Sequence, residues 1–328
     1  MVQIFLIGIG AGLTSALLFA SLATGSAFSV ALFYLTPLPI LLAGIAWNHL
    51  AGAVAALTAA ILLGAFLGLW FVLAFLIGIG APAYALAYLA LLARPVETRE
   101  GEAQALEWYP AGRIVIAASL MAATATALTI PAFGFDAESY RGALRSAFER
   151  VLRAQTGTAA DQPLTLPGTT DPAALLDLLV IVMPPAAAAL NFVTMLFNVW
   201  LAGRVARASD RLARPWPDLG AMRFPNQAPI LLAAAVAGTF LPGLIGIVAG
   251  FFSATLFLAY AVLGLAVIHG ASKAFPARQI LLTGVWLSIF VLGWPLLLIA
   301  LLGIADTMID FRARLAGGPN SSTNKPNE

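Results

Sequence analysis

The stretch MVQIFLIGIGAGLTSALLFASLATGSAFSVALFYLTPLPILLAGIAWNHL (residues 1–50) opens a run without Lys, Arg, Asp or Glu that continues as far as Arg94. A helix that crosses the hydrocarbon core of a bilayer needs roughly 20 apolar residues, so this run has room for about four crossings. Because lipid offers no partner to an unpaired strand edge, and the run does not alternate as barrel strands do, we expect helices. The sequence therefore predicts an all-α, polytopic transmembrane helical bundle.

The composition of the whole chain supports this fold class. Of 328 residues, 61% are hydrophobic and 10% are charged, against about 45–50% and about 25% in soluble domains. These values exclude a soluble enzyme, a disordered chain and a fibrous repeat. We predict eight or nine spans in one domain (residues 1–316), followed by a disordered polar tail (317–328). The spans are expected near residues 2–22, 27–47, 51–68, 70–92, 112–131, 173–203, twice within 228–271 with a division near Pro242-Gly243, and 279–304.

The distribution of basic residues predicts the orientation. Loop 204–223 carries five arginines and two aspartates, so we place it in the cytoplasm. Loop 94–111 is then also cytoplasmic, and 132–172 is an external loop. The basic C-terminal end also favours the cytoplasm, which three full crossings after residue 223 would contradict. The conflict disappears if 228–242 does not cross, and the sequence leaves both possibilities open.

The residue types that carry most enzyme chemistry are scarce. The chain has no cysteine, only two histidines (His49 and His269), and no phosphate-binding GxxxxGK[ST] loop. No nucleophile–base pair or metal triad stands out in the sequence, and no Lys/Arg patch interleaved with aromatic residues suggests a nucleic-acid partner. We therefore expect a protein that is not an enzyme and that binds no metal, cofactor or nucleic acid.

Small residues recur every four positions in the first helix, at Gly8, Gly12, Ala16 and Ala20. We call this row the small-residue ridge. A ridge of small residues lets another helix approach closely, so that van der Waals packing stabilises the contact in lipid. The ridge has two interpretations, which are packing inside this bundle and docking onto a partner membrane subunit.

Polar residues share one face of the sixth predicted helix. Asn191, Thr194 and Asn198 are spaced by three and four residues, downstream of Pro184-Pro185. Proline frees backbone carbonyls in a helix. Together with Tyr34 of the second helix, these residues are candidates to bind an uncharged solute in a cavity. The alternative is hydrogen bonding between helices.

Residues 136–155 form one amphipathic pattern within the external loop. The sequence DAESYRGALRSAFERVLRAQ places apolar residues on one helical face and charges on the other, with Arg145–Glu149 and Glu149–Arg153 at i,i+4 spacing. This pattern predicts a helix that lies on the bilayer surface. The helix is either a connector or an external lid over a cavity.

Two further charged patterns lie at the ends of helices. A row of arginines leaves the sixth helix, and we expect it to contact anionic lipid headgroups or a cytoplasmic partner. The last helix ends with Asp306 and Asp310 one turn apart, where Asp310 can pair with Arg314. The arginine row consists of Arg204, Arg207, Arg211 and Arg214.

Four segments together resemble one family. They are LIGIGAGLTSALLFASL (6–22), TPLPI (36–40), GLAVIHG (264–270) and GIADTMIDFR (303–312). The chain resembles the YybS-like group of bacterial multi-pass membrane proteins, in its alphaproteobacterial form. The most specific match is the ending G-(hydrophobic)-x-D-x-x-x-D-F-R. Its matching residues are Gly303, Asp306, Asp310, Phe311 and Arg312.

That family is in turn distantly similar to the S components of energy-coupling-factor transporters. S components capture a solute and pair with a transmembrane coupling subunit and ATPases, which they meet through a small-residue ridge on the first helix. The resemblance implies that the small-residue ridge meets such a partner. Two functions remain open at this stage: a substrate-binding transport subunit for an uncharged small solute, and a non-transporting membrane scaffold of envelope biogenesis.

Overall fold

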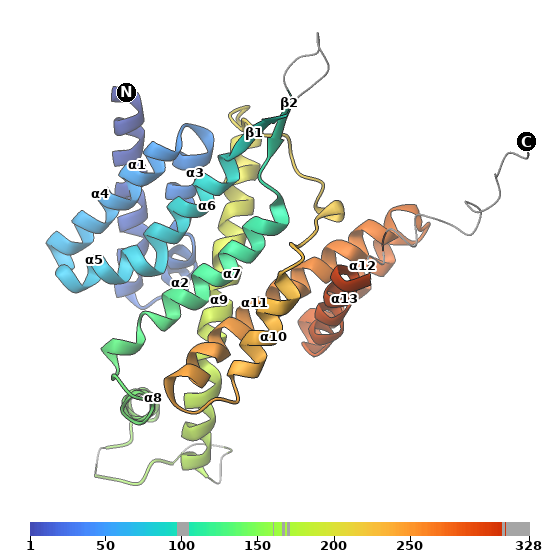
Figure 1. Ribbon diagram of the computed structural model, residues 1–328. Coiled ribbons are helices and arrows are strands. Elements are labelled where there is room, and N and C mark those ends of the chain that lie inside the picture. The colour runs from blue at the N-terminus through green and yellow to red at the C-terminus, as the bar shows by residue number, and fades with distance from the viewer. Residues whose placement is uncertain (97–104, 160, 166–167, 169–170, 310–311, 313–328) are drawn as a thin grey trace, which may run out of the picture.

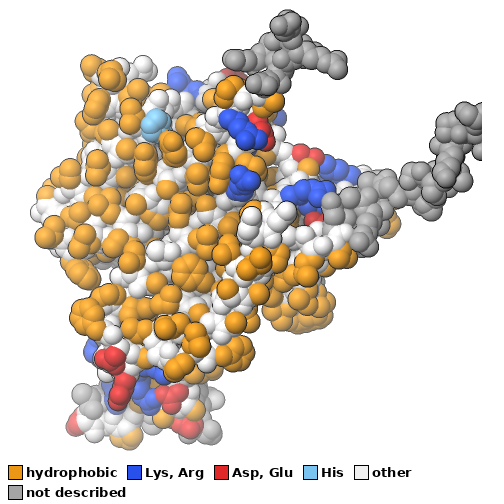
Figure 2. All heavy atoms as spheres, viewed as in Figure 1, with side chains coloured by type: hydrophobic (Ala, Val, Ile, Leu, Met, Phe, Trp, Pro, Cys, Tyr) orange, Lys and Arg blue, Asp and Glu red, His pale blue; other side chains and the backbone are white. Residues whose placement is uncertain are grey.

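The computed structural model describes the chain except for residues 97–104, 160, 166–167, 169–170, 310–311 and 313–328. It is a bundle of helices with one short β-hairpin (Figure 1). Seven helical segments in this part of the chain are long and apolar enough to cross a membrane. Figure 2 shows charged side chains gathered at two ends of the molecule, with an apolar band between them. The all-α polytopic fold is confirmed, whereas the predicted tail 317–328 lies outside the described residues.

The first four predicted spans are present, but two of them are interrupted. The second span breaks after Tyr34, and the fourth contains a π-helical turn ahead of Pro82. Both breaks follow from proline, which lacks the N–H that would continue the helical hydrogen bonding. The elements are α1 (Val2–Ala20), η1 (Ser21–Thr24), α2 (Ala27–Tyr34), α3 (Pro37–Ala46), α4 (His49–Leu67), α5 (Leu69–Phe75), η2 (Leu76–Gly80) and α6 (Ala81–Leu91).

The second part of the chain begins with an antiparallel hairpin, in which Arg94 of β1 pairs with Glu107 of β2 at 2.6 Å. Helix α9 is the longest element, with 37 residues, and it continues through Pro184 and Pro185. The elements are β1 (Ala93–Val96), β2 (Ala105–Trp108), α7 (Ala111–Ala127), η3 (Ile130–Ala132), α8 (Ala137–Thr156), α9 (Pro172–Ala208), η4 (Leu219–Ala221), α10 (Ala228–Gly238), α11 (Gly243–Ala271), η5 (Ser272–Ala274), α12 (Arg278–Leu292) and α13 (Pro295–Ile309).

The region 228–271 divides as predicted, because α10 ends at Gly238 and α11 begins at Gly243. Helix α10 alone is too short to cross the membrane. However, Gly220 packs on Gly270 and Gly238 packs on Ala249. These contacts are 21 helical residues apart along α11, or about 31 Å, which matches the thickness of the hydrocarbon core. The irregular segment before α10, together with α10, therefore runs along most of the length of α11.

The predicted single span at 279–304 is wrong. Two helices of 15 residues replace it, and the turn between them contains Gly293, with φ of +72°, followed by Pro295. Each helix is about 22 Å long, which is shorter than the hydrocarbon core. The residues that flank this hairpin contact the same short segment, since Lys273 pairs with Asp218 and Arg312 binds the carbonyl of Gly220. The two ends of this hairpin therefore lie close together, beside η4.

The amphipathic helix predicted at 136–155 is present as α8. Asp136 caps it by accepting hydrogen bonds from the backbone N–H groups of Glu138 and Ser139. Figure 1 views α8 almost along its axis, at the end of the bundle. Its apolar residues Tyr140 and Leu144 are buried in a cluster with residues of α7, α9 and α11. Helix α8 therefore packs across the bundle, on the side opposite the β-hairpin.

The charged face of α8 pairs differently from one part of the prediction. The pair Glu149–Arg153 is confirmed at 2.7 Å. Arg145, in contrast, forms its ion pair with Asp177 of α9, so the predicted Arg145–Glu149 pair is wrong. The i,i+4 spacing allows Arg145 to pair with Glu149, but α8 lies close to α9, and Asp177 of α9 is the partner that Arg145 binds.

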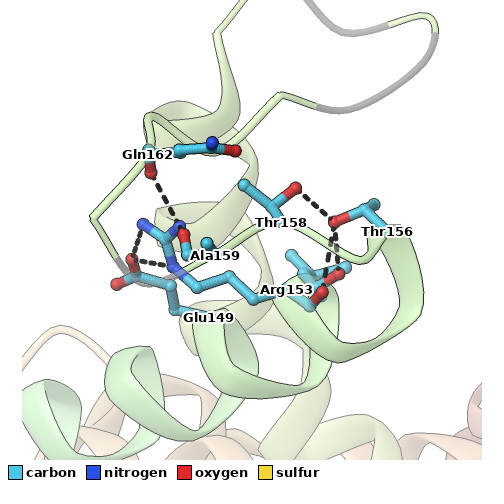
Figure 3. Close-up of polar contacts among 7 residues, drawn as sticks. Glu149, Arg153, Thr156, Thr158, Ala159 and Gln162 are labelled. Atoms are coloured by element: carbon cyan, nitrogen blue, oxygen red, sulfur yellow. Dashed lines mark hydrogen bonds and ion pairs between the residues drawn. The ribbon is translucent and has the colours of Figure 1, made fainter.

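Replacing Arg153 with alanine is expected to release the loop that follows α8. Figure 3 shows the Arg153 guanidinium between Glu149 and the backbone carbonyls of Ala159 and Gln162, to which it donates hydrogen bonds of 2.9 Å. Charge-assisted bonds to carbonyls stabilise a loop by about 1.5–3 kcal/mol each. Backbone amides at 157–162 should exchange with deuterium at least tenfold faster in Arg153→Ala than in wild type. Arg141→Ala, on the same helix, is the control, and equal rates in wild type and Arg153→Ala would contradict the role of Arg153.

Candidate functional site

The break between α2 and α3 collects the buried polar groups of several helices. The amide of Asn198, on α9, donates hydrogen bonds of 2.8 Å to the carbonyl of Tyr34 and 2.7 Å to the carbonyl of Thr194. The hydroxyl of Ser15, on α1, donates to the carbonyl of Thr36 at 2.8 Å. We call this cluster of Ser15, Tyr34, Thr36, Thr194 and Asn198 the helix-break site.

The local sequence explains why these carbonyls are available. In an uninterrupted helix, the N–H of Leu38 would bind the carbonyl of Tyr34. At the break, Leu38 binds the carbonyl of Leu35 instead, at 3.0 Å. The carbonyl of Tyr34 is then left without a helical partner, and Asn198 supplies the missing donor. Satisfying a freed carbonyl in this way is a requirement for a broken helix inside a membrane.

Two oxygen atoms in the helix-break site are left over. The Oδ1 of Asn198 and the Oγ1 of Thr36 have no hydrogen-bond partner within the described part of the chain. Both residues are 0% exposed. A buried polar atom without a partner costs about 1–3 kcal/mol. These two atoms are therefore places where a small polar molecule would gain hydrogen bonds.

The four residues that the sequence suggested for a solute site do not all meet. Tyr34, Thr194 and Asn198 come together, although Tyr34 takes part through its backbone carbonyl while its ring packs beside Phe33. Asn191 lies two turns away along α9, about 10 Å from Asn198. It is half-buried and has no hydrogen bond in the described structure. Of the three polar residues on this face of α9, Thr194 and Asn198 therefore belong to the helix-break site, and Asn191 does not.

The small-residue ridge, which lies on α1, packs against α4 within the bundle. A Cβ atom at Gly8 would overlap Val54 and the carbonyl of Ala51, and one at Gly12 would overlap Thr58 and the carbonyl of Ala55. Ala16 is buried as well, whereas Ala20 is exposed. Helix α4 thus covers most of the ridge. Packing within the bundle accounts for Gly8 and Gly12, and contact of the ridge with a partner subunit stays a prediction.

The arginine row at the end of α9 contacts tryptophan rings. Arg211 lies 4.8 Å above the ring centre of Trp47, and both Arg204 and Arg207 lie over Trp216. The guanidinium of Arg214 donates to the carbonyls of Ala90 and Tyr109, and burial lowers its pKa. Cation–π contacts leave the outer face of a guanidinium open to lipid or solvent. The row therefore joins α9 to its neighbours on the side that we predict to be cytoplasmic.

The family-like ending GIADTMIDFR forms a buried ion pair. Asp306 and Arg312 approach to 2.7 Å, with side chains that are 3% and 13% exposed. The Arg312 guanidinium also donates to the carbonyls of Gly220 and Met222, each at 2.7 Å. Gly303 allows α13 to approach the backbone of α11 at Tyr260. Asp310, Phe311 and Arg314, with the predicted pair Asp310–Arg314, lie outside the described residues.

This ion pair is the feature that sequence reasoning missed. The pattern drew attention to both aspartates, but it did not show that Arg312 joins α13 to η4. A second, exposed pair reinforces the same region, since Lys273 lies 2.8 Å from Asp218 and its hydrogen bond lowers the pKa of that carboxyl. In the described ranges, no group of three or more His, Cys, Asp or Glu residues is placed to hold a metal ion.

These observations define a class: an integral, multi-pass membrane protein whose buried polar groups serve mainly to join broken helices. A family profile described as "Predicted membrane protein (DUF2232)" matches residues 12–307. The chain belongs to this family. Among the curated proteins and the solved structures, none matches this chain.

Proposed function

We propose that this protein is the substrate-binding subunit of a transporter in the bacterial inner membrane, and that its solute is small and uncharged. The observation that carries this proposal is the pair of unpartnered oxygens of Thr36 and Asn198 in the helix-break site. Broken helices near the middle of a membrane are typical solute sites in transporters, because they offer backbone groups that an intact helix does not. The site's own side chains are neutral, which favours a neutral solute over an ion.

Helix α2 is the element best suited to admit a solute. It is only eight residues long, and one of them, Ser29, is buried. In α3, by contrast, seven of ten residues are buried. An element with few buried contacts opens at a low free-energy cost. We infer that α2 swings at the break while α3 stays in place, which would expose Thr36 and Asn198.

Energy for transport would come from a partner. The sequence has no nucleotide-binding loop, so a coupling subunit with ATPases would have to supply it, as the likeness to S components implies. Because α4 covers Gly8 and Gly12, such a subunit would dock on another surface. In this proposal the protein binds its solute without chemical change and needs no cofactor.

Replacing Asn198 with alanine tests the proposed site. Purified protein in detergent would be screened by thermal shift against uncharged polar solutes, and a solute that binds should raise the Tm of the wild type. In Asn198→Ala the apparent affinity for that solute should fall at least tenfold, since the alanine removes the acceptor Oδ1. The basal Tm should also fall, because two hydrogen bonds of about 0.6 kcal/mol each are lost.

Asn191→Ala is the matched control, since it removes the same amide from the same helix two turns away. We expect it to bind the solute as the wild type does. Binding that survives in Asn198→Ala, or that is lost equally in both variants, would refute the helix-break site. A screen in which no solute shifts the Tm would refute solute binding itself.

A non-transporting scaffold of envelope biogenesis is the second candidate function. The observation that favours it is the burial of the small-residue ridge against α4, because S components use such a ridge to dock on their partner. A scaffold would use its exposed surfaces, including the arginine row and α8, to recruit lipids or proteins. Co-purification with cell-envelope machinery, together with an unchanged Tm in the solute screen, would support the scaffold over the transport subunit.

A further inference from the structure

We infer that the surface around Arg113 is a binding site for a phosphate-bearing anion. Two grooves, each of about 380 Å³, meet at this residue. They lie at the start of α7, on the side that also holds the β-hairpin and η4. The groove that carries the proposal, here called the Arg113 groove, is lined chiefly by Pro110, Arg113, Arg223, Pro225, Asn226 and Gln227. The inference is independent of the proposed solute site.

The shape of the Arg113 groove follows from a close backbone contact. A Cβ atom at Gly112 would overlap the carbonyl of Arg223, so the segment before α10 lies directly against the start of α7. In extended backbone, successive side chains point to opposite sides. Met222 and Phe224 are buried accordingly, and Arg223 between them is exposed. This alternation places Arg223 on the same surface as Arg113.

The chemistry of the Arg113 groove favours a phosphate. Among the residues that the structure describes, its lining includes two arginines and no acidic side chain, and the side-chain amides of Asn226 and Gln227 add neutral donors. Arg223 already has an interaction within the protein, so Arg113 is the principal candidate ligand. Guanidinium groups bind phosphate with paired hydrogen bonds of the charge-assisted kind. A volume of about 380 Å³ also accommodates a phosphate together with the group it is attached to.

The N–H groups of the Arg113 guanidinium are available to donate hydrogen bonds to a ligand. Its only described interaction is with the Tyr109 ring, at 5.9 Å from the ring centre, and it forms no hydrogen bond or ion pair with any residue that the structure describes. Several other cations on this side already bind carboxylates or carbonyls of the protein. They are Arg94 with Glu107, Arg214 with two carbonyls, Lys273 with Asp218, and Arg312 with Asp306.

The phosphate could come from a lipid headgroup or from a soluble phosphate ester, and two arms of one experiment distinguish them. In the lipid arm, full-length protein from nanodiscs of phosphatidylglycerol in phosphatidylcholine is analysed for retained phosphatidylglycerol by native mass spectrometry. In the soluble arm, inorganic phosphate is titrated while the Tm is followed in neutral detergent. In the arm whose probe binds the wild type, Arg113→Gln should weaken that binding about fivefold. Arg113→Lys, which keeps the charge without the paired donors, should give an intermediate result.

Lys273→Gln is the control, because it removes a cation from the same side that is already paired with Asp218. It should bind as the wild type does. The variants are suitable because Arg113 and Lys273 are both exposed, and an unchanged Tm without ligand confirms folding. A loss with Arg113→Gln in the lipid arm assigns a headgroup, and a loss in the phosphate arm assigns a soluble ester. Equal losses in Arg113→Gln and Lys273→Gln, or no binding in either arm, would overturn the inference.

Discussion

Replacing Arg312 with alanine is expected to lower the free energy of unfolding by about 3–5 kcal/mol, because it leaves a buried carboxylate without its partner. The Asp306 side chain is 3% exposed and pairs with no other cation among the described residues, while Arg312 also donates to the carbonyls of Gly220 and Met222. The measurement is unfolding by SDS titration or by heat in detergent. Limited proteolysis should in addition show earlier cleavage between α12 and α13.

Two further variants sharpen the Arg312 experiment. In Asp306→Asn/Arg312→Ala the buried charge is gone from both positions, so this double variant should be more stable than Arg312→Ala alone. Lys273→Ala breaks a pair whose side chains are each 56% exposed, and it should be hard to distinguish from the wild type. If Arg312→Ala unfolds as the wild type does, the pair does not join the hairpin to η4.

Gly12→Leu is expected to disrupt the packing of α1 on α4. The new side chain would occupy the space of Thr58 and of the carbonyl of Ala55. Overpacking of this kind costs about 1–3 kcal/mol, and backbone on one side of the contact limits relaxation. We expect a clearly lower Tm and a broadened size-exclusion peak for the purified variant.

Gly10→Leu is the matched control for Gly12→Leu. Gly10 is on the same helix, and a Cβ there would meet no atom within 4 Å. Its substitution should leave the Tm unchanged. A partner-docking role for the ridge would give the reverse signature, in which Gly12→Leu folds normally and loses only an interacting subunit. The two results are separable in a single preparation that measures the Tm and co-purification together.

Local patterns in the sequence predicted the regular elements well. Helix α8 was visible because its charges and apolar residues alternate with helical period, and α4 because its apolar run ends at glycine. The last hairpin was missed because residues 279–304 are mostly apolar and contain no charged residue. Gly293 and Pro295 stand at the turn, but glycine and proline also occur within continuous membrane helices. Only the contacts of Lys273 and Arg312 show that the chain turns back.

The candidate site was predicted in part for a similar reason. Asn198 was identified from its helical face, and Tyr34 was included as a polar residue of the second predicted helix. The sequence could not show that Asn198 binds a backbone carbonyl, because that bond depends on how α2 and α3 separate. It also could not show that Asn191 stays apart. Periodicity tells which side chains share a face of one helix, whereas a site depends on how different helices meet.

The ion pair of Arg312 has a consequence for the order of biosynthesis. The carbonyls that this side chain binds lie 92 and 90 residues earlier in the chain. Every membrane segment up to α13 must therefore leave the ribosome before the contact can form. A product that is truncated before residue 312 would lack the contact of Arg312 with these carbonyls. We expect membrane quality-control proteases to degrade such a product.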